Sequence, residues 1–193
     1  MERNILRKLP SLKFLNLKDN LISHIDATDS FAEVSDLEEL YLDGNLLSHT
    51  IEDTSTPFRH LGKLRVLGLS RNNIKSVGSL ALAGLENLET VDLSENVIST
   101  VQESSFQDTA HISRIMINSS SLLCDCHLRW LAQFINETGV EGVTGTCAHP
   151  ESLKDRVVTS IDADSFTCQD FPKPYFQVEP KSQIALRGKV RLK

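Results

Sequence analysis

A repeated pattern of aliphatic residues limits what this chain can fold into more than any other feature. The frame L-x-x-L-x-L-x-x-N-x-L, in which isoleucine or valine can replace leucine, fits five times, and its copies start 25, 27, 24 and 24 residues apart. Periods of about 20–29 residues with this frame are typical of solenoids in which each repeat makes one coil. The copies span 12–22, 37–47, 64–74, 88–98 and 112–122, and the fifth has Ser120 in place of asparagine.

The physical meaning of the frame is a stack of short strands. Each L-x-L predicts a strand whose two aliphatic side chains point inward while the residue between them points outward. Burying one such leucine contributes about 1.5–3 kcal/mol, but only when a neighbouring coil covers it. The asparagine turns the chain after the strand, and its amide can pair backbone groups that would cost about 1–3 kcal/mol each if buried unpaired. We therefore predict an α/β leucine-rich-repeat solenoid, with short parallel strands on the concave face and a mostly irregular convex side.

The outward strand positions form the predicted concave face, which is the usual binding surface of a solenoid. Their charges alternate in sign from one rung to the next, and pairing between oppositely charged neighbouring strands would explain this pattern without any ligand. The other explanation is a binding footprint that includes Tyr41. The candidate residues of that footprint are Phe14, Asn16, Tyr41, Asp43, Arg65, Arg71, Asp92, Glu95, Arg114 and Met116.

All four cysteines follow the last repeat, at Cys124, Cys126, Cys147 and Cys168. Their even number and close grouping are typical of a protein that folds in an oxidising compartment, and they predict two disulfides of about 3–4 kcal/mol each. Cys124 and Cys126 cannot easily bond to each other, so each needs a different partner. A four-cysteine zinc site is the competing interpretation, but structural zinc usually shows paired knuckles of the form C-x₂₋₄-C, and here the one tight pair has a single residue between its cysteines.

A helix is predicted inside the cysteine-rich segment. Apolar residues recur at helical spacing from Leu128 to Ile135, Asp125 is a plausible N-cap, and Gly139 stands where such a helix would end. This helix would lay its apolar face over the last rung and cover the open end of the core. The two N-x-[ST] triplets of the chain begin at Asn118 and Asn136, and alongside disulfides we expect both asparagines to carry glycans.

Several classes of function are disfavoured by composition and motifs. The net charge of −6 argues against nucleic acid as a partner, because that partner requires a dense basic surface. The chain has no G-x-S-x-G, no P-loop and no G-x-G-x-x-G, and its histidines lack metal-ligand spacing, so we predict no enzyme, no cofactor and no metal site. A secretory signal and a membrane-spanning stretch are also missing from the sequence. Since the cysteines indicate an extracellular protein, we expect both ends to be missing from this chain.

Four stretches carry a resemblance to a known family. They are 51–54 (IEDT), 118–126 (NSSSLLCDC), 147–154 (CAHPESLK) and 166–174 (FTCQDFPKP). The repeat frame followed by C-x-C and two later cysteines resembles the leucine-rich-repeat C-terminal flanking domain of extracellular receptors. The four stretches resemble, more narrowly, the Lrig family of transmembrane receptors with leucine-rich repeats and immunoglobulin-like domains. The resemblance covers essentially the whole chain, and 147–154 is its most specific part.

The resemblance implies more than the residues alone. It implies the disulfides Cys124–Cys147 and Cys126–Cys168. It also implies repeats over 1–123, a cysteine-rich cap over 124–171, and the truncated start of an immunoglobulin-like domain over 172–193. By the same resemblance the chain is the non-enzymatic, extracellular protein-binding module of a single-pass plasma-membrane receptor. Its partner would be a protein ligand or co-receptor such as a receptor tyrosine kinase, whose growth-factor signalling the receptor modulates.

Three other parent proteins would place a similar module in a different context. Peroxidasin-like enzymes and neurotrophin-receptor-like kinases carry leucine repeats and immunoglobulin domains beside a catalytic domain. A secreted guidance or matrix protein similar to Slit is the third. In each of these the present segment would still only bind.

Overall fold

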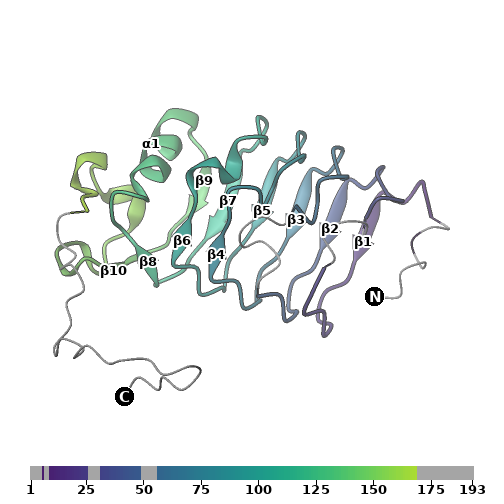
Figure 1. Cartoon of the computed structure of the whole chain (residues 1–193), viewed down its shortest axis with the longest axis horizontal. Coiled ribbons are helices and arrows are strands. Elements are labelled where there is room, and N and C mark those ends of the chain that lie inside the picture. The colour runs from purple at the N-terminus through teal and green to yellow at the C-terminus, as the bar shows by residue number, and fades with distance from the viewer. Residues whose placement is uncertain (1–5, 7–8, 26–30, 49–55, 169–193) are drawn as a thin grey trace, which may run out of the picture.

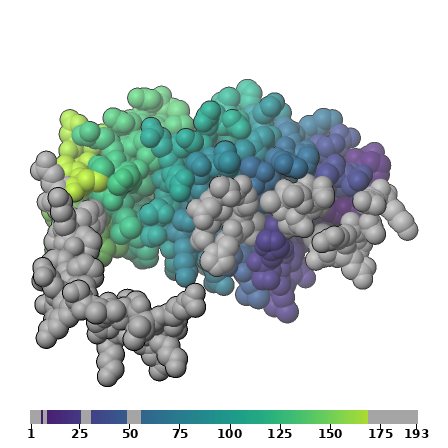
Figure 2. Space-filling model, in the orientation of Figure 1, coloured from purple at the N-terminus to yellow at the C-terminus, as the bar shows by residue number. Residues whose placement is uncertain are grey.

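The computed structural model describes residues 6, 9–25, 31–48 and 56–168. Within them the chain winds into a solenoid whose coils lie side by side, from β1 at one end to the cysteine-rich cap at the other (Figure 1). The space-filling view shows these coils packed into one elongated body (Figure 2). The predicted fold class is confirmed. The segment 172–193, which the resemblance assigns to an immunoglobulin-like domain, lies outside the described residues, as does 51–54.

A parallel sheet of six short strands runs along the solenoid in the order β1-β2-β3-β5-β7-β9. The inward repeat residues form one row across its strands, because Leu15, Leu40 and Leu67 lie side by side in register. Val91 and Ile115 continue this row. The strands are β1 (Phe14–Asn16), β2 (Glu39–Tyr41), β3 (Val66–Gly68), β5 (Thr90–Asp92), β7 (Arg114–Ile117) and β9 (Glu141–Val143). The sixth strand, β9, comes from the cap, so the sheet extends one strand beyond the five repeats.

The opposite side of the solenoid is mostly irregular. It contains one short parallel pair, β4 (Ser76–Val77) with β6 (Thr100–Val101), and a 3₁₀ turn over Glu103–Phe106. Aromatic rings fill the space between coils there, since Phe31 stacks on Phe58 at 6.1 Å between ring centroids. The inward residues of the second to fourth coils are almost fully buried, as are Ile115, Ile117 and Leu122 of the fifth, while Ile112 is partly buried against them. Together they form one continuous apolar core.

Asparagine side chains bind each coil to the one before it. Asn72 is buried; its Nδ2 donates to the Leu42 carbonyl oxygen at 3.0 Å, and its Oδ1 accepts from the Leu47 backbone N–H at 3.0 Å. Asn45 and Asn96 make the same two bonds one coil earlier and one coil later. Each asparagine therefore pairs backbone groups of two coils at once, which is the role that the repeat frame predicts for it.

The fifth coil differs from this pattern in one respect. Ser120, which the frame places at the asparagine position, is exposed. The buried residue is Ser119, whose Oγ donates to the Ile98 carbonyl oxygen at 2.7 Å. In the four earlier coils the residue before the asparagine is left-handed, at Asp19, Gly44, Arg71 and Glu95. The described part of the fifth coil has no left-handed residue at this turn, so the serine one position earlier faces inward.

The cap covers the last coil with a helix and two disulfides. Helix α1 (Arg129–Thr138) ends at Gly139, which is left-handed with φ 70° and donates its N–H to the Ile135 carbonyl oxygen. Leu131 and Ala132 lie on its buried face, and the indole Nε1 of Trp130 donates to the Val101 carbonyl oxygen at 3.1 Å. In the part of the chain that the structure describes, no helix has the length and apolarity needed to cross a bilayer.

The start of this helix corrects the prediction from sequence. Asp125 is not its N-cap, because the helix begins four residues later and follows Leu128. The Asp125 carboxylate instead accepts the His127 backbone N–H at 2.9 Å, in a turn that the bond from Leu128 N–H to the Asp125 carbonyl oxygen closes. The chain needs this turn because Cys124 and Cys126 lie on either side of Asp125 and bond in different directions.

The disulfides join Cys124 to Cys147 and Cys126 to Cys168, which are the pairs that the family resemblance implies. Cys147 lies in β10 (Cys147–His149), which pairs in parallel with β8 (Leu122–Leu123) just before Cys124. The first disulfide therefore fastens two neighbouring strands, and the second closes the outside of the cap. A zinc site would need free thiolates, whereas all four sulfurs are bonded in pairs.

Candidate protein-binding surface

The outward side of the six-stranded sheet is here called the sheet face. It carries the strand side chains that alternate with the inward, core-forming ones. It is most exposed at β1, where Phe14 and Asn16 are both open to solvent and the Phe14 ring is 52% exposed. Val66, Thr90, Asp92 and Met116 are half-buried along the middle of the sheet. The sequence therefore predicted correctly that these side chains leave the core.

An aromatic pair lies at the β1–β2 end of the sheet face. The Phe14 and Tyr41 ring centroids are 5.5 Å apart, and the Lys18 Nζ lies 4.3 Å from the Tyr41 ring centroid. The Tyr41 hydroxyl donates to Glu39 Oε2 at 2.8 Å, and this hydrogen bond to a carboxylate raises the pKa of Tyr41. The ring is thus fixed at its edge while Phe14 beside it keeps an open face.

The charged positions of the sheet face mostly bond to one another. Arg65 binds Glu89 on the next coil through two hydrogen bonds of 2.8 and 3.0 Å, and Lys13 lies 2.7 Å from Glu38. These cations hold the pKa of both carboxyl groups below their usual values. The contacts support the explanation that alternating charges pair across neighbouring rungs.

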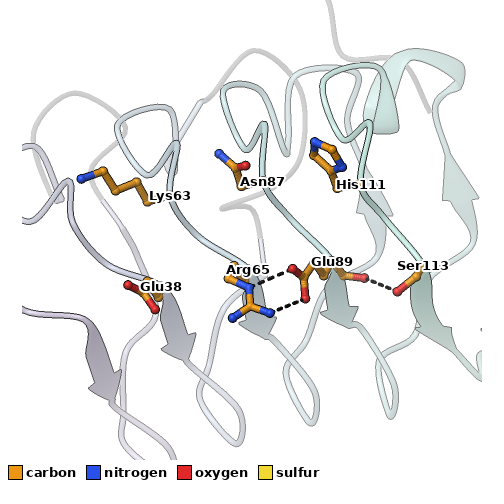
Figure 3. A pocket seen from close by; sticks show the side chains of 7 residues that line it. All are labelled: Glu38, Lys63, Arg65, Asn87, Glu89, His111 and Ser113. Atoms are coloured by element: carbon orange, nitrogen blue, oxygen red, sulfur yellow. Dashed lines mark hydrogen bonds and ion pairs between the residues drawn. The ribbon is translucent and has the colours of Figure 1, made fainter.

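The same pairing extends to the loops that lead into the strands. Figure 3 shows a pocket there, with the Arg65–Glu89 bonds across its floor and the Ser113 hydroxyl donating to the Glu89 carbonyl oxygen at 3.2 Å. Lys63 extends its amine away from the other labelled side chains of Figure 3, lies 2.6 Å from Asp36, and lowers the pKa of that carboxyl group. The residues that line it are Glu38, Lys63, Arg65, Asn87, Glu89, His111 and Ser113. Because most of these charges already have partners, the pocket has little charge left for a ligand.

Asp43 is the one candidate that the structure removes from the exposed footprint. Its carboxylate is only 4% exposed and lies in the space beside Gly68, which has no side chain. Asp43 Oδ1 accepts the backbone N–H and the hydroxyl of Ser70 at 3.1 and 2.7 Å, while Oδ2 faces Lys18 Nζ at 3.3 Å. Asp43 therefore connects its own coil to the coils before and after it, and its carboxylate is not exposed to a ligand.

The remaining candidates lie at different places along the solenoid. Arg71 is exposed and bonds to Asp19, and Glu95 is exposed in the next turn. Asp92 is half-buried, and its Oδ1 accepts both the backbone N–H and the hydroxyl of Ser94. At the other end Arg114 is exposed and lies 3.4 Å from Glu141 of β9, a partner that the repeat frame gave no means of finding.

Both candidate glycan acceptors lie at the surface. Asn136 is exposed in the last turn of α1. Asn118 is exposed just after β7, and its Oδ1 accepts the Glu95 backbone N–H at 2.7 Å. A glycan on Asn118 would stand beside the C-terminal end of the sheet face, far from the aromatic pair.

Comparison with known proteins agrees with this architecture. The family model described as "Leucine rich repeat" matches residues 1–47 and 58–122. The mouse protein "Leucine-rich repeats and immunoglobulin-like domains protein 3" is 41% identical over 140 residues, and human protein 1 of the same name is 42% identical over 143. These matches cover 72% and 74% of this chain, but the chain spans only 12% and 13% of those relatives.

Among solved structures, a similar chain occurs in the octameric complex of Latrophilin 3, Unc5D and FLRT2 (LRR). It superposes with a TM-score of 0.57 at 22% identity, over 79% of this chain and 53% of that one, so it supports the fold alone. The predicted resemblance to the Lrig proteins is confirmed by the matches at 41% and 42% identity. With the repeat model matched across more than half of its residues, the chain belongs to the leucine-rich repeat family.

Proposed function

We propose that this chain is a non-enzymatic protein-binding module that works outside the cell, and that the β1–β2 end of its sheet face is the contact site. The observation that carries this proposal is the aromatic pair formed by the exposed Phe14 and the half-buried Tyr41. Aromatic side chains supply much of the binding energy at protein interfaces because they bury a large area for few rotatable bonds. A protein ligand that covered Phe14 would bury apolar surface that now faces water.

The paired charges of the sheet face have a different role in this proposal. Arg65 and Glu89 already pair with each other, and exposed pairs of this kind contribute little binding energy of their own. Their arrangement favours partners of complementary charge pattern and opposes the rest, so it adds specificity more than affinity. We therefore place the centre of the contact on the aromatic pair and its rim on the charged coils.

The wider biological context of the proposal rests on relatives. The relatives' names join leucine-rich repeats to immunoglobulin-like domains, which supports the proposal that 172–193 starts such a domain. The two disulfides after the last repeat support the proposal that 124–171 is a cap. We propose that the parent is a single-pass receptor displaying this module on the extracellular side of the plasma membrane, where it modulates growth-factor receptor tyrosine kinase signalling. A parent similar to peroxidasin, to neurotrophin-receptor kinases or to Slit would use the same module for recognition only.

The test is binding of the secreted chain to cells that display single receptor tyrosine kinase ectodomains. We expect saturable binding to at least one of them, and a loss of about 30-fold or more in affinity for Phe14→Ala combined with Tyr41→Ala. Tyr41→Phe keeps the ring and should bind nearly as well as the natural chain. Leu21→Ala is the matched control, because Leu21 is 83% exposed but lies outside the strands.

Two results would count against this proposal, and they differ in meaning. If the double variant bound as tightly as the Leu21→Ala variant while its thermal unfolding was unchanged, the contact site would lie elsewhere on the module. If no ectodomain in the panel bound the natural chain, the receptor tyrosine kinase context would be wrong while the site remained to be tried with other secreted proteins.

A further inference from the structure

The two disulfides of the cap lie in very different surroundings. Cys124 and Cys147 are fully buried, whereas Cys126 and Cys168 are both exposed. Thiol–disulfide exchange needs an incoming thiolate to reach one sulfur of the bond, so access decides which disulfide can react. In the folded protein that access exists at Cys126–Cys168 and is closed at Cys124–Cys147.

A histidine lies beside the exposed bond. Nδ1 of His127 is 3.7 Å from the Cys168 Sγ and 3.9 Å from the Cys126 Sγ. Its position is fixed by Asp125, whose Oδ1 accepts the His127 backbone N–H at 2.9 Å and lies 3.3 Å from the same Nδ1. Asp125 is itself mostly buried, so the imidazole is held over the sulfurs although it is 83% exposed.

We propose that Cys126–Cys168 is a thiol-exchange site for a low-molecular-weight monothiol, with His127 as the proton donor to the departing sulfur. The incoming thiolate attacks one sulfur and forms a mixed disulfide with it. The Cys126–Cys168 bond breaks, and its electron pair stays on the other sulfur, which takes a proton from His127 Nδ1. The incoming thiol is oxidised and one cysteine is reduced, so two electrons and one proton are accounted for. Either sulfur can leave, because both lie at similar distances from Nδ1.

The structural consequence of exchange is local. Phe166, two residues before Cys168, is buried, and the inner disulfide stays closed. The core of the cap therefore keeps its anchors when the outer bond opens. What changes is the attachment of the chain beyond Phe166, which is no longer tied to Cys126.

The experiment treats the folded chain with reduced glutathione, quenches it at intervals with an alkylating reagent, and maps every cysteine by peptide mass spectrometry. We expect glutathione on Cys126 or Cys168, with Cys124 and Cys147 still bonded to each other. The unfolding temperature should fall, because the opened outer bond no longer restricts the unfolded chain. His127→Gln should slow the exchange by about ten-fold, which is below the usual 10²–10⁴ of general acid catalysis because the contacts of 3.7 and 3.9 Å from Nδ1 to the two sulfurs are long.

A matched control tests whether the rate depends on His127 itself and not on losing any exposed histidine of the cap. His149 is also exposed and lies two residues after Cys147, so His149→Gln should leave the rate unchanged. Equal rates for the His127→Gln and His149→Gln variants would overturn the role of His127. Modification of Cys124 and Cys147 at the same rate as the outer pair would overturn the site itself.

Discussion

Arg71 Nη1 lies 3.1 Å from Asp19 Oδ1, so a guanidinium of the third coil pairs with a carboxylate of the first. The pair passes over Gly44 of the coil between them. A Cβ at position 44 would overlap the Asp19 carboxylate and touch the guanidinium at 3.4 Å. The contact between the two outer coils therefore depends on a glycine in the middle one.

Replacing this glycine should destabilise the solenoid. Gly44→Ala puts a Cβ on a left-handed backbone with φ 67°, which costs about 1–2 kcal/mol, and it also separates Arg71 from Asp19. Chemical unfolding should therefore show a loss of at least about 1 kcal/mol. Gly62→Ala is the control, since the nearest atom to its Cβ would be 3.7 Å away. Equal losses for the two variants would contradict this account.

A repeat asparagine should contribute more to the free energy of unfolding when it is buried in the middle of the stack than when it lies in an exposed turn. Asn72→Ala leaves the buried Leu47 N–H without its partner and removes one of the two bonds to the Leu42 carbonyl, which still accepts from Asn45 Nδ2. A buried group left unpaired costs about 1–3 kcal/mol. We expect a loss of about 2 kcal/mol or more in the free energy of unfolding. Asn20→Ala is the comparison, because the bonds of Asn20 are exposed. A similar loss in both variants would show that burial does not set the cost.

Acid should weaken the coil-to-coil pairs within a defined pH window. Lys63, Lys13 and Arg65 lower the pKa of Asp36, Glu38 and Glu89 from their ordinary values of 3.8, 4.5 and 4.5. A carboxyl group with a lowered pKa in the folded state adds stability above its ordinary pKa, and this stability is lost as the pH falls through the lowered value.

We therefore expect thermal stability to fall as the pH drops below about 4.5, and to fall less in the variant with Asp36→Asn, Glu38→Gln and Glu89→Gln. Melting curves at a series of pH values measure this, and high salt should reduce the difference because the groups are exposed. A triple variant with the same acid sensitivity as the natural chain would contradict the prediction.

Glycans are expected at both sequons when the chain passes through a eukaryotic secretory pathway. Asn118→Gln and Asn136→Gln should each remove one step in gel mobility, and the double variant should no longer respond to a glycosidase. Asn87→Gln serves as control because Asn87 does not begin an N-x-[ST] triplet. A glycosidase-resistant natural chain would contradict both assignments.

The stacked coils were predictable because the frame itself contains their physics. Leu40 and Leu67 can be buried together only if coils of about equal length lie in register. The positions that the frame predicted wrongly depend on contacts with residues of another coil. Asp43 is buried because Gly68, a coil later, leaves space for its carboxylate. Two adjacent serines look alike in the frame, so the choice of Ser119 had to come from the three-dimensional turn.

The sixth strand is the clearest limit of the sequence pattern. Residues 141–143 read E-G-V and have no L-x-L, yet β9 pairs with β7 because the cap brings it there. For a similar reason, the sequence predicted the members of the aromatic pair but not the contact between them. Tyr41 stood out as a bulky residue at an outward position, but its contact with Phe14 follows from the register of two strands.

The outer disulfide also decides how the module responds to mechanical load. Tension applied through the chain after Cys168 passes across the sulfur bridge directly to Cys126 and into the solenoid, so it bypasses the segment between these two cysteines, which are 42 positions apart in the sequence. Helix α1 and strand β9 lie in that shielded segment and need not resist the pull. Opening this bridge alone would place only residues 147–168 in line with the force, because the closed Cys124–Cys147 bond still bypasses α1 and β9, and it would release up to about 70 Å of extended chain. The cap would then act as a length reserve at the point where the chain leaves the repeats.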